Sequence, residues 1–490
     1  MHTSDYIIFI AYLAGVTIFG MTFFRKSKTA RQFTLGNQSI PGWVVMMSIF
    51  ATYVSSISYL ALPGSAFMSN WNPFVFSLSI PFAALVAVKF FVPLYRKINS
   101  PSAYTYLEQR FGPWARIYAS ASYFLTQLMR IGTILYLLSL TVSTIFGWDI
   151  RLVIIVTGLI VMVYSTLGGI QAVVWTDAIQ GIVLIGGALA TVIVILAGMP
   201  EGPMQVFRIA SENGKFSLGS FGAELSEQTF WVVLVYGLFI NLQNFGIDQN
   251  YVQRYIAARS DREARQAALR GGMLYIPVSL LFLFIGTALF AYYRSGAAEL
   301  PAELLEPGRS DSVFPWFIVH QLPAGITGLL ISSIFAAGMS TISTSYNSSA
   351  TVFLTDYYQR FFSKIPSGRE EMRVLYVSSL VISICGIVIA LAMINVKSVL
   401  DTWWKLASVF SGGMLGLFLL GLTTKRKNVA GAIAGVIVGL VIILWMSLSG
   451  VASAGRGEIP RFHTYLSIVF GTSAIFLVGF LFTILRKRKQ

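Results

Sequence analysis

Apolar runs of about 20 residues recur along nearly the whole chain, and most of them end at Gly, Pro or a basic cluster. A helix needs about 20 predominantly apolar residues to cross a bilayer, so each run predicts one membrane-spanning helix. Thirteen runs are present, at residues 5–24, 42–66, 72–95, 115–146, 150–170, 174–198, 228–250, 268–293, 323–358, 372–395, 399–422, 429–449 and 463–485. The pattern therefore predicts an all-α polytopic membrane protein with thirteen transmembrane helices and one transmembrane domain over residues 1–490.

Composition supports this interpretation and narrows the chemistry. The chain is 56% hydrophobic and 11% charged, with a mean hydropathy of +0.72, whereas about a quarter of an average soluble domain is charged. The single cysteine, Cys385, cannot form an internal disulfide, and the three histidines are scattered along the sequence. These features exclude an ordinary soluble protein, a disulfide framework and a metal cluster built on cysteine or histidine.

The basic residues predict the orientation in the membrane. If the N-terminus is outside, 24 of the 35 Lys and Arg residues fall in cytoplasmic connections, 8 fall outside, and Lys89, Arg130 and Lys405 lie within spans. Cytoplasmic loops carry the excess of basic residues, so we expect the N-terminus outside and the C-terminus in the cytoplasm. The net charge of +15 then matches anionic lipid headgroups, and no nucleic-acid partner is expected.

Two apolar runs contain polar clusters that predict broken helices. The second run holds five hydroxyl-bearing residues between Thr52 and Ser58, and the seventh holds Asn241, Gln243 and Asn244. The two runs are five spans apart, as expected for inverted five-helix repeats whose first helices are discontinuous. We expect an extra helix at 5–24, repeats at 42–198 and 228–422, and two C-terminal helices within 429–485. Alternatively, the hydroxyls bond to their own helices or pack against small residues.

The ninth run carries a stripe of oxygen atoms. At about 100° per residue, Ser340, Thr341 and Thr344 share one helix face with Ala337, and Ser343 lies on the adjacent edge. A small hard cation needs several oxygen ligands, and the unwound stretch from Ala51 to Val54 could add carbonyl groups. The alternative is a packing seam of small residues.

Arg130 lies in the middle of an apolar run, where a basic residue costs about 2.5–3.5 kcal/mol on insertion scales. It either pairs with a carboxylate, of which Asp177 is the main candidate, or lines a cavity and receives an anionic ligand. We favour the second alternative because guanidinium binds carboxylates in a bidentate manner. Asp177 itself either caps a helix or completes a cation site.

Several segments resemble the sodium:solute symporter family. They are GGIQAVVWTDAIQG at 168–181, FAAGMSTISTSYNS at 335–348, FGIDQNYVQRYIAARS at 245–260, and FATYVSSISYL at 50–60. The resemblance implies thirteen helices, two inverted five-helix repeats and sodium-coupled uptake by alternating access, without enzymatic activity. It also implies a first sodium site, formed by the carbonyls of Ala51, Val54 and Ala337 and the hydroxyls of Ser340 and Thr341.

Within that family the chain is similar to the bacterial sialic acid transporter branch, in which an arginine at the position of Arg130 receives the substrate carboxylate. This likeness implies a second sodium site at Asp177, Ser340, Ser343 and Thr344. It implies substrate contacts at Tyr53, Ser55, Ser58, Ser77, Asn241 and Asn244. Tyr53 and Ser77 depart from the branch, where a smaller hydroxyl residue and a glutamine are expected, so the particular substrate is in question.

From these observations we expect a monomeric sodium symporter in a bacterial inner membrane. It would import N-acetylneuraminate, a small carboxylated solute, with two sodium ions per substrate. The alternative is sodium symport of another solute, such as a monocarboxylate, an amino acid, a neutral sugar or a polyol. A channel, a membrane enzyme or a sensor domain is less consistent with the sequence, because neither a selectivity loop nor a catalytic dyad is visible.

Overall fold

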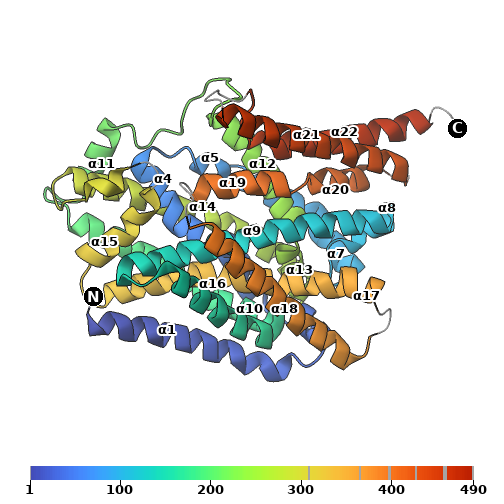
Figure 1. Cartoon of the computed structure of the whole chain (residues 1–490), viewed down its shortest axis with the longest axis horizontal. Coiled ribbons are helices and arrows are strands. Elements are labelled where there is room, and N and C mark those ends of the chain that lie inside the picture. The colour runs from blue at the N-terminus through green and yellow to red at the C-terminus, as the bar shows by residue number, and fades with distance from the viewer. Residues whose placement is uncertain are drawn as a thin grey trace.

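The computed structural model describes residues 2–306, 309–362, 366–394, 399–424, 427–455 and 461–487. Within these residues the chain is helical, and its only β pairing is an isolated bridge between Ile40 and Ala258. The long helices run roughly along the long axis of the molecule (Figure 1). Helix α1 begins at one end of this bundle and α22 ends at the other, so the described chain begins and ends on opposite faces. Seven basic residues used in the orientation argument lie outside the described residues: 364, 397, 425, 426, 456, 488 and 489.

The α-helices are α1 (Thr3–Met21), α2 (Ala30–Leu35), α3 (Gly42–Tyr53), α4 (Leu62–Met68), α5 (Phe74–Ser77), α6 (Ile80–Val86), α7 (Val92–Ile98), α8 (Thr105–Phe111), α9 (Pro113–Phe146), α10 (Ile150–Ala197), α11 (Met204–Glu212), α12 (Phe230–Ile247), α13 (Gln249–Ala257), α14 (Asp261–Arg294), α15 (Val313–Gln321), α16 (Ile326–Val352), α17 (Gln359–Phe361), α18 (Gly368–Ala392), α19 (Val399–Phe410), α20 (Met414–Thr423), α21 (Val429–Gly455) and α22 (Leu466–Lys487). The short 3-10 and π segments are η1 (Thr22–Lys26), η2 (Gly36–Gln38), η3 (Ile57–Ala61), η4 (Ala87–Phe91), η5 (Ala302–Leu305), η6 (Ser310–Ser312) and η7 (Phe353–Tyr358).

The number of spans differs from the prediction. By length and apolar composition, the described residues form 10 membrane-crossing helices, or up to 12 if each of two bent pairs is one span, against the thirteen predicted. The predicted span 150–170 corresponds to the first part of α10, where the apolar helix Ile150–Val163 is shorter than the others. Helix α10 is interrupted at Gly169, whose φ of 60° suits glycine because it has no Cβ. The all-helical polytopic fold is confirmed, and the count of thirteen is not.

Both predicted helix breaks are present. Helix α3 ends at Tyr53, Val54 is extended, and the chain resumes at Ile57 with a bend of 58°. In the second repeat, α12 ends at Ile247, Asp248 is extended, and α13 follows. The breaks come in the first helix of each predicted repeat, as expected for inverted repeats. The predicted repeat boundaries, 42–198 and 228–422, stay a prediction.

Each break is capped by the polar residue that the sequence supplies there. The Ser55 Oγ accepts a hydrogen bond from the Ile57 backbone N–H at 3.2 Å, and Asp248 Oδ1 accepts one from the Asn250 N–H at 2.8 Å. A new helix begins with N–H groups that have no intrahelical partner, and these side chains satisfy one of them at each break. Polar residues at membrane depth therefore stabilise the interrupted helices.

A third break was not predicted. The span expected at 399–422 is divided between α19 and α20, which are bent by 45° around Gly412 and Gly413, with φ values of 59° and 67°. The signal in the sequence is the Gly-Gly pair after Ser411, and no cluster of polar residues like those at the other two breaks surrounds it. The prediction of a continuous helix at this position is wrong because two adjacent glycines adopt the left-handed conformation, which side chains disfavour.

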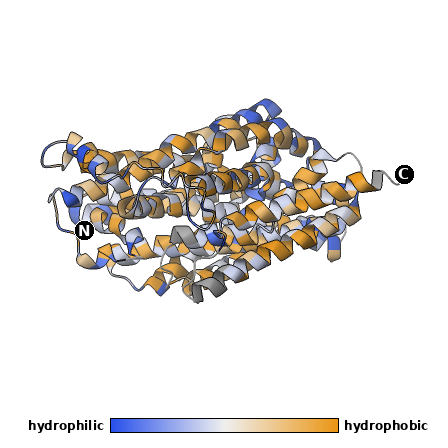
Figure 2. Cartoon of the chain, turned by 90° about the horizontal axis from the view of Figure 1, so that it is seen from above, coloured by the Kyte–Doolittle hydropathy of each residue, from blue (hydrophilic) through white to orange (hydrophobic). Residues whose placement is uncertain are grey.

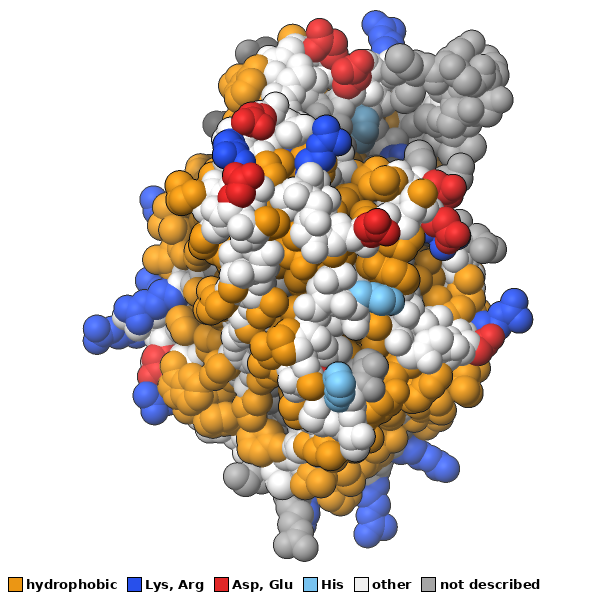
Figure 3. Space-filling model, turned by 90° about the vertical axis from the view of Figure 1, so that its left-hand side faces the viewer, with side chains coloured by type: hydrophobic (Ala, Val, Ile, Leu, Met, Phe, Trp, Pro, Cys, Tyr) orange, Lys and Arg blue, Asp and Glu red, His pale blue; other side chains and the backbone are white. Residues whose placement is uncertain are grey.

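Hydrophobic residues cover most of the length of the bundle, and hydrophilic residues gather toward its ends (Figure 2). Exposed apolar side chains such as Ile193, Leu448 and Ile7 lie on membrane-length helices, which fits a lipid-facing surface. Figure 3 looks onto the end where α1 begins. Acidic and basic side chains lie in the upper part of this face and around its edges, and hydrophobic side chains lie between them. The predicted outer connections carry the short helices α11 and α15.

Candidate substrate and cation sites

A central cavity of about 80 Å³ lies where the two broken helices meet α9 and α19. Of the predicted substrate residues, five line it, and all of them lie at a break or on α9 or α12: Tyr53, Ser55, Ser58, Arg130 and Asn244. Breaks place side chains and backbone groups at mid-membrane depth without exposing them to lipid. The cavity is therefore the candidate substrate site.

Arg130 lies on the wall of this cavity and is only 9% exposed. Its Nη2 donates to the Thr52 carbonyl at 2.8 Å, at the end of α3, where the helix breaks. The predicted alternative of pairing with Asp177 is wrong, because Asp177 forms its ion pair with Arg254. The geometry agrees with the favoured interpretation, in which Arg130 faces a cavity.

Sequence reasoning missed a carboxylate on the same cavity. Asp248 lines it together with Arg130, and its Oδ2 accepts a hydrogen bond from Gln127 Nε2 at 3.3 Å. A lone aspartate near the end of an apolar run is typical of a membrane interface, so the sequence alone did not mark it. Only the position of the helix break brings Asp248 to the cavity.

Aromatic rings fill much of the cavity wall. The ring of Tyr53 stacks on Phe245 at a centroid distance of 5.4 Å and packs edge-on against Tyr275 at 4.4 Å. Its hydroxyl donates to Asn241 Oδ1. Tyr53, one of the two departures from the expected branch pattern, therefore takes up space beside Arg130 that a small hydroxyl residue would leave open.

The structure does not bring two predicted substrate residues to the cavity wall. Asn241 is buried behind Tyr53, and its Nδ2 donates to the Ser79 Oγ at 2.9 Å and the Phe76 carbonyl at 3.1 Å. Ser77 lies within hydrogen-bond distance of Ser279, with 3.1 Å between the two hydroxyl oxygens. In this conformation both side chains connect helices to one another.

All five residues of the predicted first sodium site meet between α3 and α16. The Ser340 Oγ donates to the Ala51 carbonyl at 3.0 Å, and the Thr341 Oγ1 lies 3.3 Å from the Val54 carbonyl. Both hydroxyls also lie 3.0–3.3 Å from the Ala337 carbonyl. The break after Tyr53 frees carbonyl groups from helical bonding at this point. The result is a buried set of uncharged oxygens, a donor set that suits a small hard cation.

The predicted second sodium site contains a buried ion pair. The Asp177 Oδ2 accepts hydrogen bonds from Ser48 Oγ and Arg254 Nη2, both at 2.6 Å, and both charged side chains are fully buried. The same Nη2 donates to Thr344 Oγ1 at 2.6 Å. The Ser343 Oγ donates to the Ser340 carbonyl at 3.1 Å.

One atom of this second site lacks a partner. The buried Oδ1 of Asp177 has no hydrogen-bond partner among the described residues. A buried, unpaired carboxylate oxygen is costly, and it would suit a cation ligand. Arg254, which the orientation argument assigned to a cytoplasmic connection, was not anticipated as the neighbour of this site.

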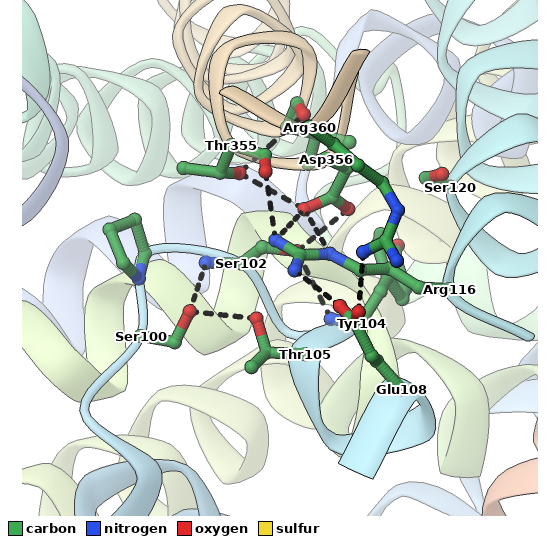
Figure 4. Close-up of polar contacts among 12 residues, drawn as sticks. Ser100, Ser102, Tyr104, Thr105, Glu108, Arg116, Ser120, Thr355, Asp356 and Arg360 are labelled. Atoms are coloured by element: carbon green, nitrogen blue, oxygen red, sulfur yellow. Dashed lines mark hydrogen bonds and ion pairs between the residues drawn. The ribbon is translucent and has the colours of Figure 1, made fainter. Parts of the chain in front are cut away.

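A polar cluster joins α8, α9 and η7 at the end of the bundle that carries the predicted cytoplasmic connections (Figure 4). Arg116 reaches between two carboxylates, with Nε 2.7 Å from Asp356 Oδ1 and Nη1 2.7 Å from Glu108 Oε2. Burial alone would raise the pKa of the Glu108 carboxyl, but hydrogen bonds from Arg116 and Arg360 lower it below its usual value. The cluster ties the ends of these helices together.

Comparison with known proteins agrees with the geometry. The model of the sodium:solute symporter family matches residues 33–439. The sodium/sialic acid symporter SiaT of Proteus mirabilis is 35% identical over 447 residues, which are 90% of this chain and 88% of the relative. The sodium/sialic acid symporter NanT of Aliivibrio fischeri is 32% identical over 98% of this chain and 92% of the relative.

A solved structure also matches nearly the whole chain. It shows a Na⁺-coupled sialic acid symporter in a substrate-bound outward-open state, with a TM-score of 0.90 and 31% sequence identity over 99% of this chain and 98% of the other. The similarity confirms the expected fold class, a transporter core of inverted repeats, and sodium as the coupling ion. The chain belongs to the sodium:solute symporter family and is a multi-pass membrane transporter, not an enzyme.

Proposed function

We propose that this symporter imports a carboxylated sugar of the sialic acid class, and that Arg130 binds its carboxylate in the central cavity. The observation that carries the proposal is the position of Arg130, a guanidinium at mid-membrane depth on the wall of a cavity. A buried arginine is costly unless it pairs with an anion, and its planar fork matches a carboxylate. Two relatives, SiaT and NanT, are sodium/sialic acid symporters, which supports the same substrate class.

Two sodium ions accompany each substrate in this proposal. The first is held by Ala51, Val54, Ala337, Ser340 and Thr341. The second is held by Asp177, Ser340, Ser343 and Thr344, with the unpaired Oδ1 of Asp177 as its charged ligand. The five clustered oxygens and the buried free carboxylate oxygen support these assignments.

The energetics favour two ions over one. A tenfold sodium gradient supplies about 1.4 kcal/mol per ion, and one charge moving through 100 mV supplies about 2.3 kcal/mol. One sodium with a monoanionic substrate is electroneutral, so the gradient alone supports roughly tenfold accumulation. Two sodium ions move one net charge and supply about 5 kcal/mol, enough for accumulation of several thousand-fold.

In the cell, we place this transporter in a bacterial inner membrane as a functional monomer, with its N-terminus outside and its C-terminus in the cytoplasm. The bacterial origin of both relatives and the threefold excess of basic residues in the predicted cytoplasmic connections support this arrangement.

A second candidate is sodium symport of a smaller carboxylic acid. The specific observation in its favour is Tyr53, whose ring occupies the cavity beside Arg130 where a small hydroxyl residue is expected in sialic acid transporters. A carboxylate without the bulky sugar would still reach Arg130. The two candidates share the sodium sites and the role of Arg130 and differ only in the size of the solute.

The test uses binding and uptake by the purified protein and three variants. We expect Arg130→Ala to lose N-acetylneuraminate binding by at least tenfold, Arg130→Lys to recover part of it, and sodium to protect all forms against heating. Tyr53→Ser distinguishes the two candidates by uptake. If the sugar acid is the substrate, uptake of N-acetylneuraminate by this variant should be unchanged or higher than in wild type. If wild type transports only small acids and Tyr53→Ser gains the sugar acid, the second candidate holds. Unchanged acid binding by Arg130→Ala contradicts both.

A further inference from the structure

A basic pocket lies at the end of the bundle that carries the predicted cytoplasmic connections, away from the substrate and sodium sites. It has a volume of about 480 Å³ and lies between the segment that follows α1, at Phe24 in η1 and at Ser27 and Lys28, and the beginning of α18, at Arg369 and Arg373. Among the described residues, the three cationic side chains lining it, Lys28, Arg369 and Arg373, form no ion pair or hydrogen bond. Three unpaired cations in one pocket attract an anion.

An apolar groove of about 800 Å³ continues from this pocket along the side of the bundle. It runs between α9, η7 and α18, and both spaces share Arg373 and Val377 as lining residues. The groove is lined almost entirely by apolar and aromatic side chains, including Phe124, Leu128 and Phe353. Leu125, Val377 and Val381 on its walls are each about half exposed, so the groove opens toward the lipid phase.

The dimensions of the groove match one lipid tail. Its wall on α18 extends from Arg373 to Cys385, and twelve residues of helix rise about 18 Å. The hydrocarbon core of a bilayer is about 30 Å thick, so one leaflet is about half of that. The groove therefore reaches from a cationic pocket at one membrane face to about the bilayer midplane.

We propose that an anionic phospholipid of the bilayer occupies this site, with its phosphate in the basic pocket and one acyl chain in the groove. Basic pockets between transmembrane helices on the cytoplasmic side bind anionic headgroups, and each Lys or Arg near the surface adds to the attraction. A soluble anion would use the pocket but leave the adjoining apolar surface uncovered, whereas a phospholipid satisfies both. The bound lipid bridges η1 and α18 and packs on α9 and η7, the continuation of α16.

The protein is reconstituted in equal amounts of phosphatidylglycerol and phosphatidylcholine and is then purified again in detergent. Native mass spectrometry measures how much of each lipid stays bound to it. The test variant combines Lys28→Gln, Arg369→Gln and Arg373→Gln. The matched control combines Arg262→Gln, Arg265→Gln and Arg270→Gln, which removes three exposed cations from α14 outside the pocket. A second test variant, Val377→Trp, fills the groove from an exposed position and leaves the charges intact.

We expect wild type and the control to retain phosphatidylglycerol in preference to phosphatidylcholine. The triple pocket variant should retain at least tenfold less phosphatidylglycerol than wild type. Val377→Trp should also reduce retention by several-fold. Equal loss in the pocket variant and the control would mean a general charge effect and would overturn the proposal. Retention of phosphatidylglycerol by both test variants at the wild-type level would overturn it as well.

Discussion

At the residue scale, the Asp177–Arg254 pair shows what a single sequence leaves hidden. Both side chains are fully buried, and Arg254 bridges Asp177 and Thr344. The motif around Asp177 marked it as functional, but the charge pattern assigned Arg254 to a cytoplasmic connection. The partner could not be predicted, because only the break at Asp248 turns α13 so that Arg254 reaches toward α10.

Replacing Asp177 by Asn should strongly destabilise the protein, by about 3–5 kcal/mol, because it leaves the buried Arg254 charge without its carboxylate partner. The double variant Asp177→Leu with Arg254→Met should recover most of the thermal stability, since both charges are removed, yet it should lack the second sodium site. The measurement is thermal unfolding of the purified protein together with the sodium-to-substrate ratio. Arg208→Ala, which breaks an exposed pair with Glu201, is the control and should cost at most about 1 kcal/mol. A double variant that retains a two-sodium ratio would contradict the assignment of Asp177.

Lys215 provides a second prediction at this scale. It anchors the connection between α11 and α12, with Nζ 2.6 Å from the Phe67 carbonyl and 3.9 Å from the centre of the Phe290 ring. Burial lowers the pKa of Lys215 to about 8, against about 10.5 in the unfolded chain.

Because the folded protein releases this proton at lower pH than the unfolded chain does, stability should rise as pH increases from about 8 toward 10.5. Melting temperatures measured across this interval should rise less in Lys215→Met than in wild type. The matched control is Lys427→Met, at an exposed lysine beyond α20, which should keep the wild-type slope. An identical slope in wild type and Lys215→Met would contradict the burial argument.

At the element scale, the broken helices were the best-predicted part of the fold. The polar clusters near Val54 and Asn241 stand out in otherwise apolar runs, and polar groups at membrane depth are typical of broken helices and cavities. The break at Gly412 and Gly413 has no comparable polar cluster, and its only signal is the Gly-Gly pair after Ser411. The sequence likewise predicted the oxygen stripe on α16, since helical periodicity alone brings its hydroxyls onto one face.

The break after Tyr53 and the row of hydroxyls on α16 together form the first candidate sodium site, and Ser340→Ala tests this proposal. Removing this hydroxyl takes away one ligand to a charged group, worth about 1.5–3 kcal/mol, so the sodium concentration for half-maximal transport should rise roughly ten- to a hundredfold. Ser332→Ala, on the same helix, is the matched control, because the Ser332 hydroxyl bonds to the Gly328 carbonyl one turn earlier. Equal sodium dependence of the two variants would mean that the stripe is a packing seam.

At the scale of the whole molecule, the break after Tyr53 serves two candidate sites: Tyr53 lines the substrate cavity, and the Val54 carbonyl lies against Thr341 in the first cation cluster. The central claim is that a carboxylate on Arg130 and two sodium ions are carried together across the membrane. Sequence alone predicted the class of transporter, but it could not predict the cavity's shape, because Asp248 and the aromatic wall depend on how distant helices pack.

The most direct measurement is the net charge moved per labelled N-acetylneuraminate molecule taken up by proteoliposomes, at a fixed inward sodium gradient and a series of set membrane voltages. Two sodium ions with one monoanion predict one positive charge per substrate and uptake that increases as the interior becomes more negative. Sodium-driven uptake without net charge movement would contradict the two-sodium mechanism. A protein that accumulates no carboxylate under any sodium gradient would contradict the account as a whole.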